Sequence, residues 1–324
     1  MLNFGELDSS APDPFSVSVV LCTYNGLSRG FLRCAIDSVY RQTRPAHEVI
    51  VVDDGSSDGT YECISSVYPL VRVIRQSNAG LPSARNAGIR AARFSIVSFL
   101  DDDDVWEDTK LETQRNQMMA LRCPEDFIFA SRMRTIDANG VLGPVVAHDV
   151  IYSWWPACLI GNPVTGPSGV AIFKSAFGRV GYFDESLKIG EDYEFWIRCL
   201  KSGLQIAYSD ATLLLYRVHD SQMTAPKNIR YSILEVNNII MRYTGFLSDS
   251  ARNVIWTIRN IVNNRVLLKY GEVNFSQFFV DTFLRKWNVS FLVFLLFLAI
   301  KIDRFFGFRS FFGKRFLNFL LQKC

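Results

Sequence analysis

Polar and acidic turns follow three short apolar runs in the first third of the chain. The runs 16–22, 48–52 and 95–100 are rich in β-branched and aliphatic residues, which is typical of buried strands. The residues that follow these runs are Thr23-Tyr24-Asn25-Gly26, Asp53-Asp54-Gly55 and the four aspartates 101–104. Such carboxylates would repel a diphosphate unless a divalent cation lay between them. The pattern therefore predicts a Mn²⁺ or Mg²⁺ site that binds a phosphorylated ligand.

The aspartates 101–104 also have an alternative explanation. Acidic residues are common at helix starts, so Asp104 could cap a following helix in a solvated loop. The position directly after a strand as apolar as 95–100 favours the metal site, because open α/β sheets bind ligands beyond the carboxyl ends of their strands. Neither G-x-G-x-x-G in the first turn nor G-x-x-x-x-G-K-[ST] anywhere is present, which disfavours a dinucleotide dehydrogenase and a P-loop phosphotransferase.

The elements that must position these residues alternate regularly. The patterns predict strands at 16–22, 48–52, 71–74 and 95–100, separated by helices at 29–41, 58–67 and 82–92. Alternation at this spacing predicts a parallel α/β sheet. Beyond residue 104 we predict a helix at 107–121, a strand at 127–136, a long loop at 149–167, an amphipathic helix at 190–201, and strands at 204–208 and 212–218.

Five motifs in order resemble the family-2 glycosyltransferases of the GT-A fold. They are VSVVLCTYNG, VIVVDDGSSDGT, SNAGLPSARNAGI, FLDDDD and GPSGVAIFKSAFGRVGYFDESLKIGEDYEFWIRCLKSG, and together they span about 16–220. The resemblance implies an α/β GT-A domain at 1–225, with a mostly parallel sheet flanked by helices. It also implies metal-dependent, inverting transfer of one sugar from a nucleotide-diphospho-sugar, most simply a UDP-sugar, to a saccharide hydroxyl.

The resemblance also implies roles for individual residues on the donor side. Asp54 would accept from the uracil N3–H, Arg85 would flank the base, and Thr23 would contact the nucleotide. Asp101 and Asp103 match the outer positions of a D-x-D motif. Asp101 would lie near the ribose or bind the metal, and Asp103 would bind the metal. Asp102 would replace either one if the register differs. His219 would bind the metal or contact the diphosphate.

The implied catalytic base lies in Gly190-Glu191-Asp192. Displacement at an anomeric carbon needs a carboxylate that takes the acceptor proton, and Asp192 matches that position, with Glu191 as the second candidate. Both acids could instead only begin the helix at 190–201, where negative charge suits the helix dipole. A sugar nucleotidyltransferase and a non-catalytic sugar-nucleotide-binding relative are the alternative functions. The first would open with a Gly-rich loop, and the second would have lost the D-x-D or the base. Processive synthases carry Q-x-x-R-W, which is absent here.

The segment 226–324 differs from the body of the chain. Residues 1–224 contain 27 acidic and 20 basic residues, whereas residues 225–324 contain 5 acidic and 15 basic residues. In addition, 14 of the 26 Phe lie in 275–324. The uncharged stretch 287–300 is shorter than the roughly 20 residues a spanning helix needs. We therefore predict a helical region that lies on a membrane surface. The alternative is packing against the catalytic domain or a second chain in a homo-oligomer.

The remaining features predict the surroundings in which the protein works. The net charge of +3 is too small to recruit nucleic acid. The odd number of cysteines, with no C-x-x-C pair, favours buried thiols in a reducing compartment, and the first ten residues show no signal peptide. We expect a cytoplasmic protein, peripheral on the inner face of the cell membrane, with a lipid-linked acceptor of a surface polysaccharide such as an O-antigen.

Overall fold

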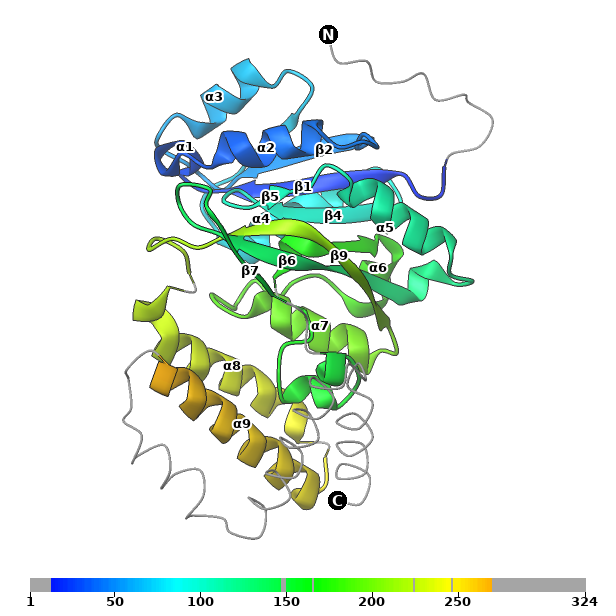
Figure 1. The fold of residues 1–324 in the computed structure, drawn as a ribbon, viewed down its shortest axis with the longest axis vertical. Coiled ribbons are helices and arrows are strands. Elements are labelled where there is room, and N and C mark those ends of the chain that lie inside the picture. The colour runs from blue at the N-terminus through cyan, green and yellow to red at the C-terminus, as the bar shows by residue number, and fades with distance from the viewer. Residues whose placement is uncertain (1–12, 147–149, 165, 224, 246, 270–324) are drawn as a thin grey trace. The chain divides into compact units, whose positions relative to one another are not determined.

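The computed structural model describes residues 13–146, 150–164, 166–223, 225–245 and 247–269 (Figure 1). These residues form two compact units. One contains the described residues up to 146 and those from 164 to 219, and the other contains 150–163 and the described residues from 220 to 269. The sequence analysis had placed 150–163 in the first domain. Whether the predicted parts 1–225 and 226–324 fold independently stays a prediction.

Four parallel strands form the first half of the sheet, as predicted. In the order β3-β2-β1-β4 they are β3 (Arg72–Arg75), β2 (Glu48–Asp53), β1 (Val17–Thr23) and β4 (Ile96–Asp101). The ladders pair Thr23 with Asp53 and Cys22 with Asp101. The carboxyl ends of β1, β2 and β4 therefore lie side by side, and the turns that follow them meet at one edge of the sheet.

The second half of the sheet is mixed. Strand β8 (Val170–Phe173) is antiparallel to β4, and β6 (Phe127–Ile136) is antiparallel to β8. Beyond them lie β9 (Gln205–Arg217), parallel to β6, then β5 (Val105–Trp106) and β7 (Leu142–Val146), antiparallel to β9 and β6. The sheet is thus parallel in its first half only. Strand β9 is one element where two were predicted, because β6 pairs with it over its whole length.

The predicted helices of this unit lie where they were expected, with one division, whereas α6 (Ser175–Val180) was not predicted. The predicted helix 29–41 is two helices, because Gly30 adopts a left-handed φ of 78° that ends the first. The α-helices are α1 (Gly26–Arg29), α2 (Leu32–Tyr40), α3 (Thr60–Val67), α4 (Leu81–Ala91), α5 (Lys110–Met119), α6 (Ser175–Val180) and α7 (Glu191–Lys201). Two 3₁₀ turns, Pro124–Asp126 and Pro167–Gly169, complete the unit.

Apolar side chains cover both faces of the sheet. Alternate residues of β1 enter two different clusters: Val19 and Leu21 pack with α2, whereas Val20 packs with α4 and α7. Burial on both faces explains why the parallel strands are continuous apolar runs instead of alternating ones. Helices α4 and α7 share one cluster, through Ile89 and Trp196 among others. They are therefore held on the same face of the sheet, which brings their polar residues together.

The second unit contains a pair of helices. They are α8 (Ile229–Thr244) and α9 (Asp249–Lys269), and short 3₁₀ turns lie at Val150–Tyr152, Ala157–Leu159 and Pro226–Asn228. The buried Arg259 of α9 donates to the carbonyl oxygens of Leu159 and Ile160, which ties the segment 150–163 to this helix. In the described part of the chain, no helix has the length and apolarity needed to cross a bilayer. The stretch 287–300 lies outside the described residues.

The described cysteines are free, but their burial differs from the expectation. Cys22, Cys158 and Cys199 are buried as expected, whereas Cys34 and Cys123 are exposed. Cys34 lies on the outer side of α2, where the helix repeat turns it away from the sheet.

Candidate active site

Asp54 holds the loop between β3 and α4. Its Oδ1 accepts from Gln76 Nε2 at 2.8 Å and from the Ala79 N–H at 2.9 Å, and its Oδ2 accepts from the Gly80 N–H at 2.8 Å. The carboxylate is 4% exposed. A carboxylate has about four acceptor positions, so one position on Oδ2 is left. The predicted contact with a uracil N3–H needs a single acceptor and is compatible with this arrangement.

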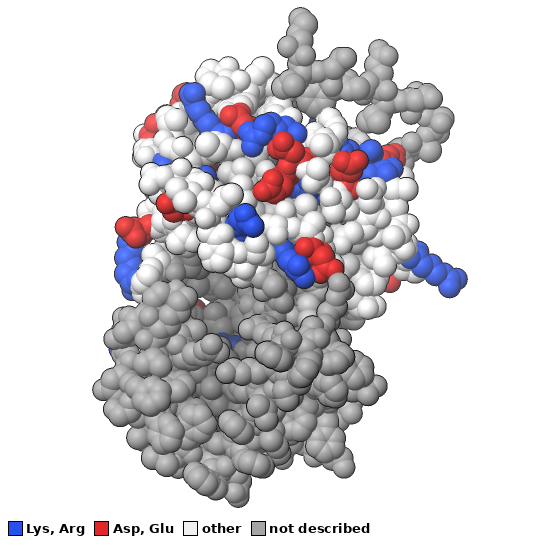
Figure 2. All heavy atoms as spheres, viewed as in Figure 1, with Lys and Arg blue, Asp and Glu red and all other residues white. Residues whose placement is uncertain are grey.

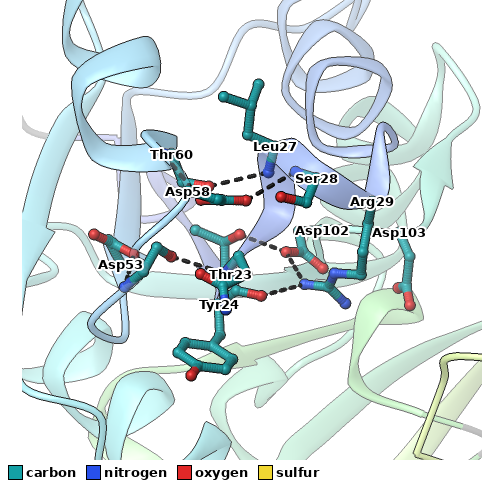
Figure 3. Close-up of polar contacts among 12 residues, drawn as sticks. Thr23, Tyr24, Leu27, Ser28, Arg29, Asp53, Asp58, Thr60, Asp102 and Asp103 are labelled. Carbon is teal, nitrogen blue, oxygen red and sulfur yellow. Dashed lines mark hydrogen bonds and ion pairs between the residues drawn. The ribbon is translucent and has the colours of Figure 1, made fainter.

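Asp102 turns toward Thr23 and Arg29 (Figure 3). Its Oδ2 accepts from Thr23 Oγ1 and from Arg29 Nη2, both at 2.5 Å, and Arg29 also donates to the Tyr24 carbonyl. A Cβ on Gly26 would lie 2.2 Å from Thr23 Oγ1, so only glycine fits beside this pair. Burial raises the pKa of Asp102 to about 7. The sequence analysis had not found Arg29.

Asp58 connects the turn after β2 to α1, as Figure 3 shows. Its Oδ2 accepts from the Ser28 N–H at 2.8 Å, and its Oδ1 accepts from the backbone and hydroxyl of Thr60. The Thr60 hydroxyl in turn accepts from the Leu27 N–H at 3.0 Å. Although burial opposes it, hydrogen bonding from Thr60 and Ser28 lowers the pKa of Asp58 to about 2. Asp58 therefore holds the two turns at a fixed separation.

Asp103 and His219 form a pair at the end of β9. The Asp103 Oδ2 lies 3.0 Å from His219 Nε2, and the imidazole packs against the Phe31 ring with centroids 5.1 Å apart. The exposed fraction is 19% for the Asp103 side chain and 5% for His219. The structure thus brings together two residues, 116 positions apart in the chain, that were predicted from separate motifs.

Arg217 and Asp104 support this pair, and the sequence analysis had given neither a site role. Arg217 Nε donates to the Asp103 carbonyl at 2.8 Å, and its N–H donates to Asp104 Oδ1 at 2.9 Å. The guanidinium also lies over Phe31, with Cζ 4.5 Å from the ring centroid. Asp104 is buried against β9 and caps no helix, since α5 begins after Thr109. The available signal was closeness in sequence, because Arg217, the last residue of β9, lies two positions before His219.

A divalent cation fits the Asp103–His219 pair. A carboxylate oxygen and an imidazole nitrogen lie 3.0 Å apart, and the Asp103 side chain is 19% exposed. This mixed donor set suits Mn²⁺ better than Mg²⁺, which takes oxygen ligands almost entirely. Among the described residues, no group of three or more His, Cys, Asp or Glu side chains is arranged to hold a metal. Asp101, the third predicted ligand, faces an arginine instead.

Arg85 bridges Asp101 and Glu191. Its Nη2 donates to Asp101 Oδ1 at 2.8 Å, and its Nη1 donates to Glu191 Oε1 at 2.5 Å. The guanidinium is 2% exposed. The two carboxylates, despite the burial of the group, raise the pKa of Arg85. This contact links the carboxyl end of β4 to the first residue of α7.

Asp192 is next to this bridge and lies in the first turn of α7. Its Oδ1 accepts from the N–H of its neighbour Tyr193 at 2.7 Å. Burial, followed by the charge of Glu191, raises the pKa of Asp192 to about 7, although Arg85 opposes this shift. Glu191, whose carboxylate is taken by Arg85, is less available to a substrate. Asp192 is therefore suited to proton transfer near neutral pH.

Family comparison agrees with this arrangement of motifs. The family description "Glycosyl transferase family 2" matches residues 18–184, about half of the chain. The chain belongs to the family-2 glycosyltransferases. This assignment and the α/β architecture described above confirm the predicted GT-A fold of the glycosyltransferase.

Curated relatives and solved structures give the extent of the similarity. An uncharacterized glycosyltransferase of Rickettsia typhi is 32% identical over 215 residues, which cover 64% of this chain and 65% of that protein. The putative teichuronic acid biosynthesis glycosyltransferase TuaG of Bacillus subtilis is 28% identical over 215 residues, 65% of this chain and 82% of TuaG. The crystal structure of S. aureus TarS 1-349 in complex with UDP aligns with a TM-score of 0.52 and 18% identity, over 95% of this chain and 90% of that one.

Proposed function

We propose that this glycosyltransferase transfers one sugar from a UDP-sugar to a saccharide hydroxyl, with inversion at the anomeric carbon. The observation that carries the proposal is the chain of contacts from Asp101 through Arg85 to Glu191, because it holds the start of α7, where Asp192 lies, at the carboxyl end of β4. Asp103, in the turn after β4, pairs there with His219. The residues proposed to bind the donor and the candidate base Asp192 are thus linked by direct contacts. Crystals of TarS with UDP-GlcNAc support a uridine nucleotide as the donor class.

Asp192 is the proposed base. Its carboxylate accepts the proton of the acceptor hydroxyl while the hydroxyl oxygen forms a bond to the anomeric carbon. The bond from that carbon to the diphosphate oxygen breaks on the opposite face, and the nucleotide diphosphate leaves with the electron pair. A base with a pKa near 7 is deprotonated at physiological pH and still basic enough to take a proton in the transition state.

Asp103 and His219 are the proposed metal ligands. When bound, Mn²⁺ or Mg²⁺ would neutralise charge on the diphosphate. Arg217 holds the Asp103 backbone and Phe31 orients the imidazole, so these two residues fix the pair in place. On the donor side, Asp54 keeps one acceptor position for the base, and Thr23 and Asp102 hold the first turn close to it.

The donor and acceptor are open to direct test. We propose a lipid-linked saccharide of a surface polymer as acceptor, supported by the similarity to TuaG, whose name assigns it to teichuronic acid biosynthesis. Purified full-length protein is incubated with a panel of UDP-, GDP- and dTDP-sugars with and without Mn²⁺, and nucleotide release is measured. Release from one or more UDP-sugars supports the proposal. Release only from another nucleotide, or nucleotide–sugar synthesis, contradicts it.

We also propose that the protein lies on the inner face of the cell membrane through its C-terminal region. The charge and aromatic content of 226–324 supports this, although residues beyond 269 lie outside the described part. On the face of the first unit visible in Figure 2, basic and acidic side chains are interspersed, which fits a partner other than nucleic acid. Truncation after residue 285 should abolish sedimentation with anionic liposomes, and salt should weaken it in the full chain. Unchanged sedimentation of the truncated protein contradicts the proposal.

A further inference from the structure

Asn86 of helix α4 hydrogen-bonds to residues 183–185, which precede α7. The Asn86 Nδ2 donates to the Phe183 carbonyl at 2.9 Å, and its Oδ1 accepts from the Phe183 N–H at 3.0 Å. The same Nδ2 donates to Glu185 Oε1 at 2.8 Å. Asn86 is 1% exposed, so this pairing is shielded from water. Asn86, within the motif SNAGLPSARNAGI, thus hydrogen-bonds through its side-chain amide to the backbone of Phe183, which is 97 residues away.

Arg85, the preceding residue, makes the second contact. Its guanidinium lies between the Asp101 and Glu191 carboxylates and above the Phe183 ring, with Cζ 5.7 Å from the ring centroid. Only 2% of the side chain is exposed. A carboxylate already accepts from each of its terminal nitrogens, and the burial leaves little of the guanidinium accessible to a nucleotide base. The enclosure therefore argues against direct contact with the base.

We propose that Arg85 is a positioning residue that, together with Asn86, fixes the start of α7 against the carboxyl end of β4 and so places Asp192. This inference rests on the proposed function, since it concerns the base of that reaction. It assigns to Glu191 the role of an anchor for α7. It also explains why Arg85 and Asn86 are adjacent. Asn86 binds residues 183–185, and Arg85 binds Glu191 at the end of the same segment.

The geometry requires a guanidinium. Its planar fork directs separate N–H groups to two carboxylates, whereas a lysine ammonium is a compact point charge. Replacement by lysine retains the charge between Asp101 and Glu191 but not the two fixed directions. Because a small misplacement of reacting groups costs about 100-fold in rate, the effect should appear in turnover.

The test compares Arg85→Lys with the wild type in the full chain. We expect kcat for UDP release, measured with the UDP-sugar selected by the panel, to fall about 10- to 100-fold. The Kd for UDP, measured by calorimetry, should stay within about threefold, because binding of the nucleotide does not use Arg85. Arg41→Lys is the control of the same chemistry; that side chain is 51% exposed and pairs with Asp108, outside all of these contacts, so both quantities should be unchanged. A UDP affinity weakened about tenfold or more would overturn the inference and make Arg85 a nucleotide ligand.

Glu191→Gln gives an independent test if Arg85→Lys does not fold. It should lower kcat and leave UDP affinity unchanged, and the double variant should lose no more activity than the worse single variant. Independent, multiplicative losses, or full activity of Glu191→Gln, would contradict the inference. If Arg85→Lys is fully active while Asp192→Asn is inactive, only the positioning role fails. If Asp192→Asn is active, the proposed base itself fails.

Discussion

The two ends of the parallel strands contain buried carboxylates in opposite electrostatic situations. At the amino end of β2, Glu48 accepts from Ser18 Oγ at 2.9 Å and from Arg93 through its N–H and Nε, and despite burial these bonds lower its pKa. At the carboxyl end, burial raises the pKa of Asp102 to about 7 and that of Asp104 well above its usual value. At the amino end the donors to Glu48 outweigh its burial, whereas at the carboxyl end burial outweighs the Arg29 and Thr23 contacts of Asp102.

This difference indicates where a charged ligand belongs. A carboxylate whose hydrogen-bond donors and counter-ion lower its pKa stabilises the fold without a bound ligand. Crowded carboxylates with raised pKa values favour the approach of a cation or a proton donor, which is why such groups gather at functional sites. The same residue types thus have separate tasks at the two ends of one strand, and the predictions below separate them.

The largest effect should come from Asp192→Asn. The amide cannot accept the acceptor proton, so turnover should fall by about 10³-fold, within the range of general-base contributions. UDP affinity should be nearly unchanged, because the base acts in the chemical step. Calorimetry and UDP release on one preparation check both quantities. Turnover within about tenfold of wild type would move suspicion to Glu191.

Asp103→Ala should have the next largest effect. Loss of one of the two proposed ligands should lower turnover by about 100-fold or more and remove the Mn²⁺ dependence of UDP binding. Asp102→Asn provides the comparison, since that carboxylate faces Thr23 and Arg29. Metal-dependent UDP binding that survives in Asp103→Ala but is lost in Asp102→Asn would place the ligand one residue earlier.

The pH dependence of turnover should show an acid limb near 7. Protonated Asp192 cannot act as a base, so kcat should fall about tenfold for each pH unit below its pKa. The profile is measured at saturating donor, and Glu48→Gln is the control, because its site lies at the other end of β2. A kcat that stays constant from pH 5 to 8 would contradict this prediction and show that another step limits turnover.

The smallest effects should be on stability, with opposite signs at the two ends. Glu48→Gln should lower the free energy of unfolding at pH 7 by about 1–2 kcal/mol, because a lowered folded-state pKa contributes stability that is present above the unfolded pKa and lost as pH falls. Asp192→Asn should be at least as stable as wild type above pH 7, because a raised folded-state pKa makes the charged carboxylate unfavourable there. Thermal melting at pH 5 and 8 distinguishes the two. Destabilisation of Asp192→Asn at pH 8 would show that the carboxylate supports the fold.

The sequence by itself determined the first half of the sheet and supplied the candidate site residues. Strands β1, β2, β3 and β4 were predictable because each is a local apolar run followed by a turn motif, and local composition is enough to identify a strand buried on both faces. The motifs also indicated Asp54, Asp103, His219 and Asp192 with no knowledge of their distances. Element β8, which completes the path from β4 to β6, was missed, because four residues inside a longer motif are too few for a periodic signal.

Only the tertiary structure decided how those residues are used. Four consecutive aspartates are equivalent in sequence, yet their carboxylates face Arg85, Thr23 with Arg29, His219 and the Arg217 backbone in turn. These five partner residues come from three separate parts of the chain, 23–29, 85 and 217–219, so no local pattern could assign them. The mixed strand order and the pairing of β9 with β6 bring these parts to one edge of the sheet. Long-range pairing is set by the packing of whole elements, and that information is not contained in any single motif.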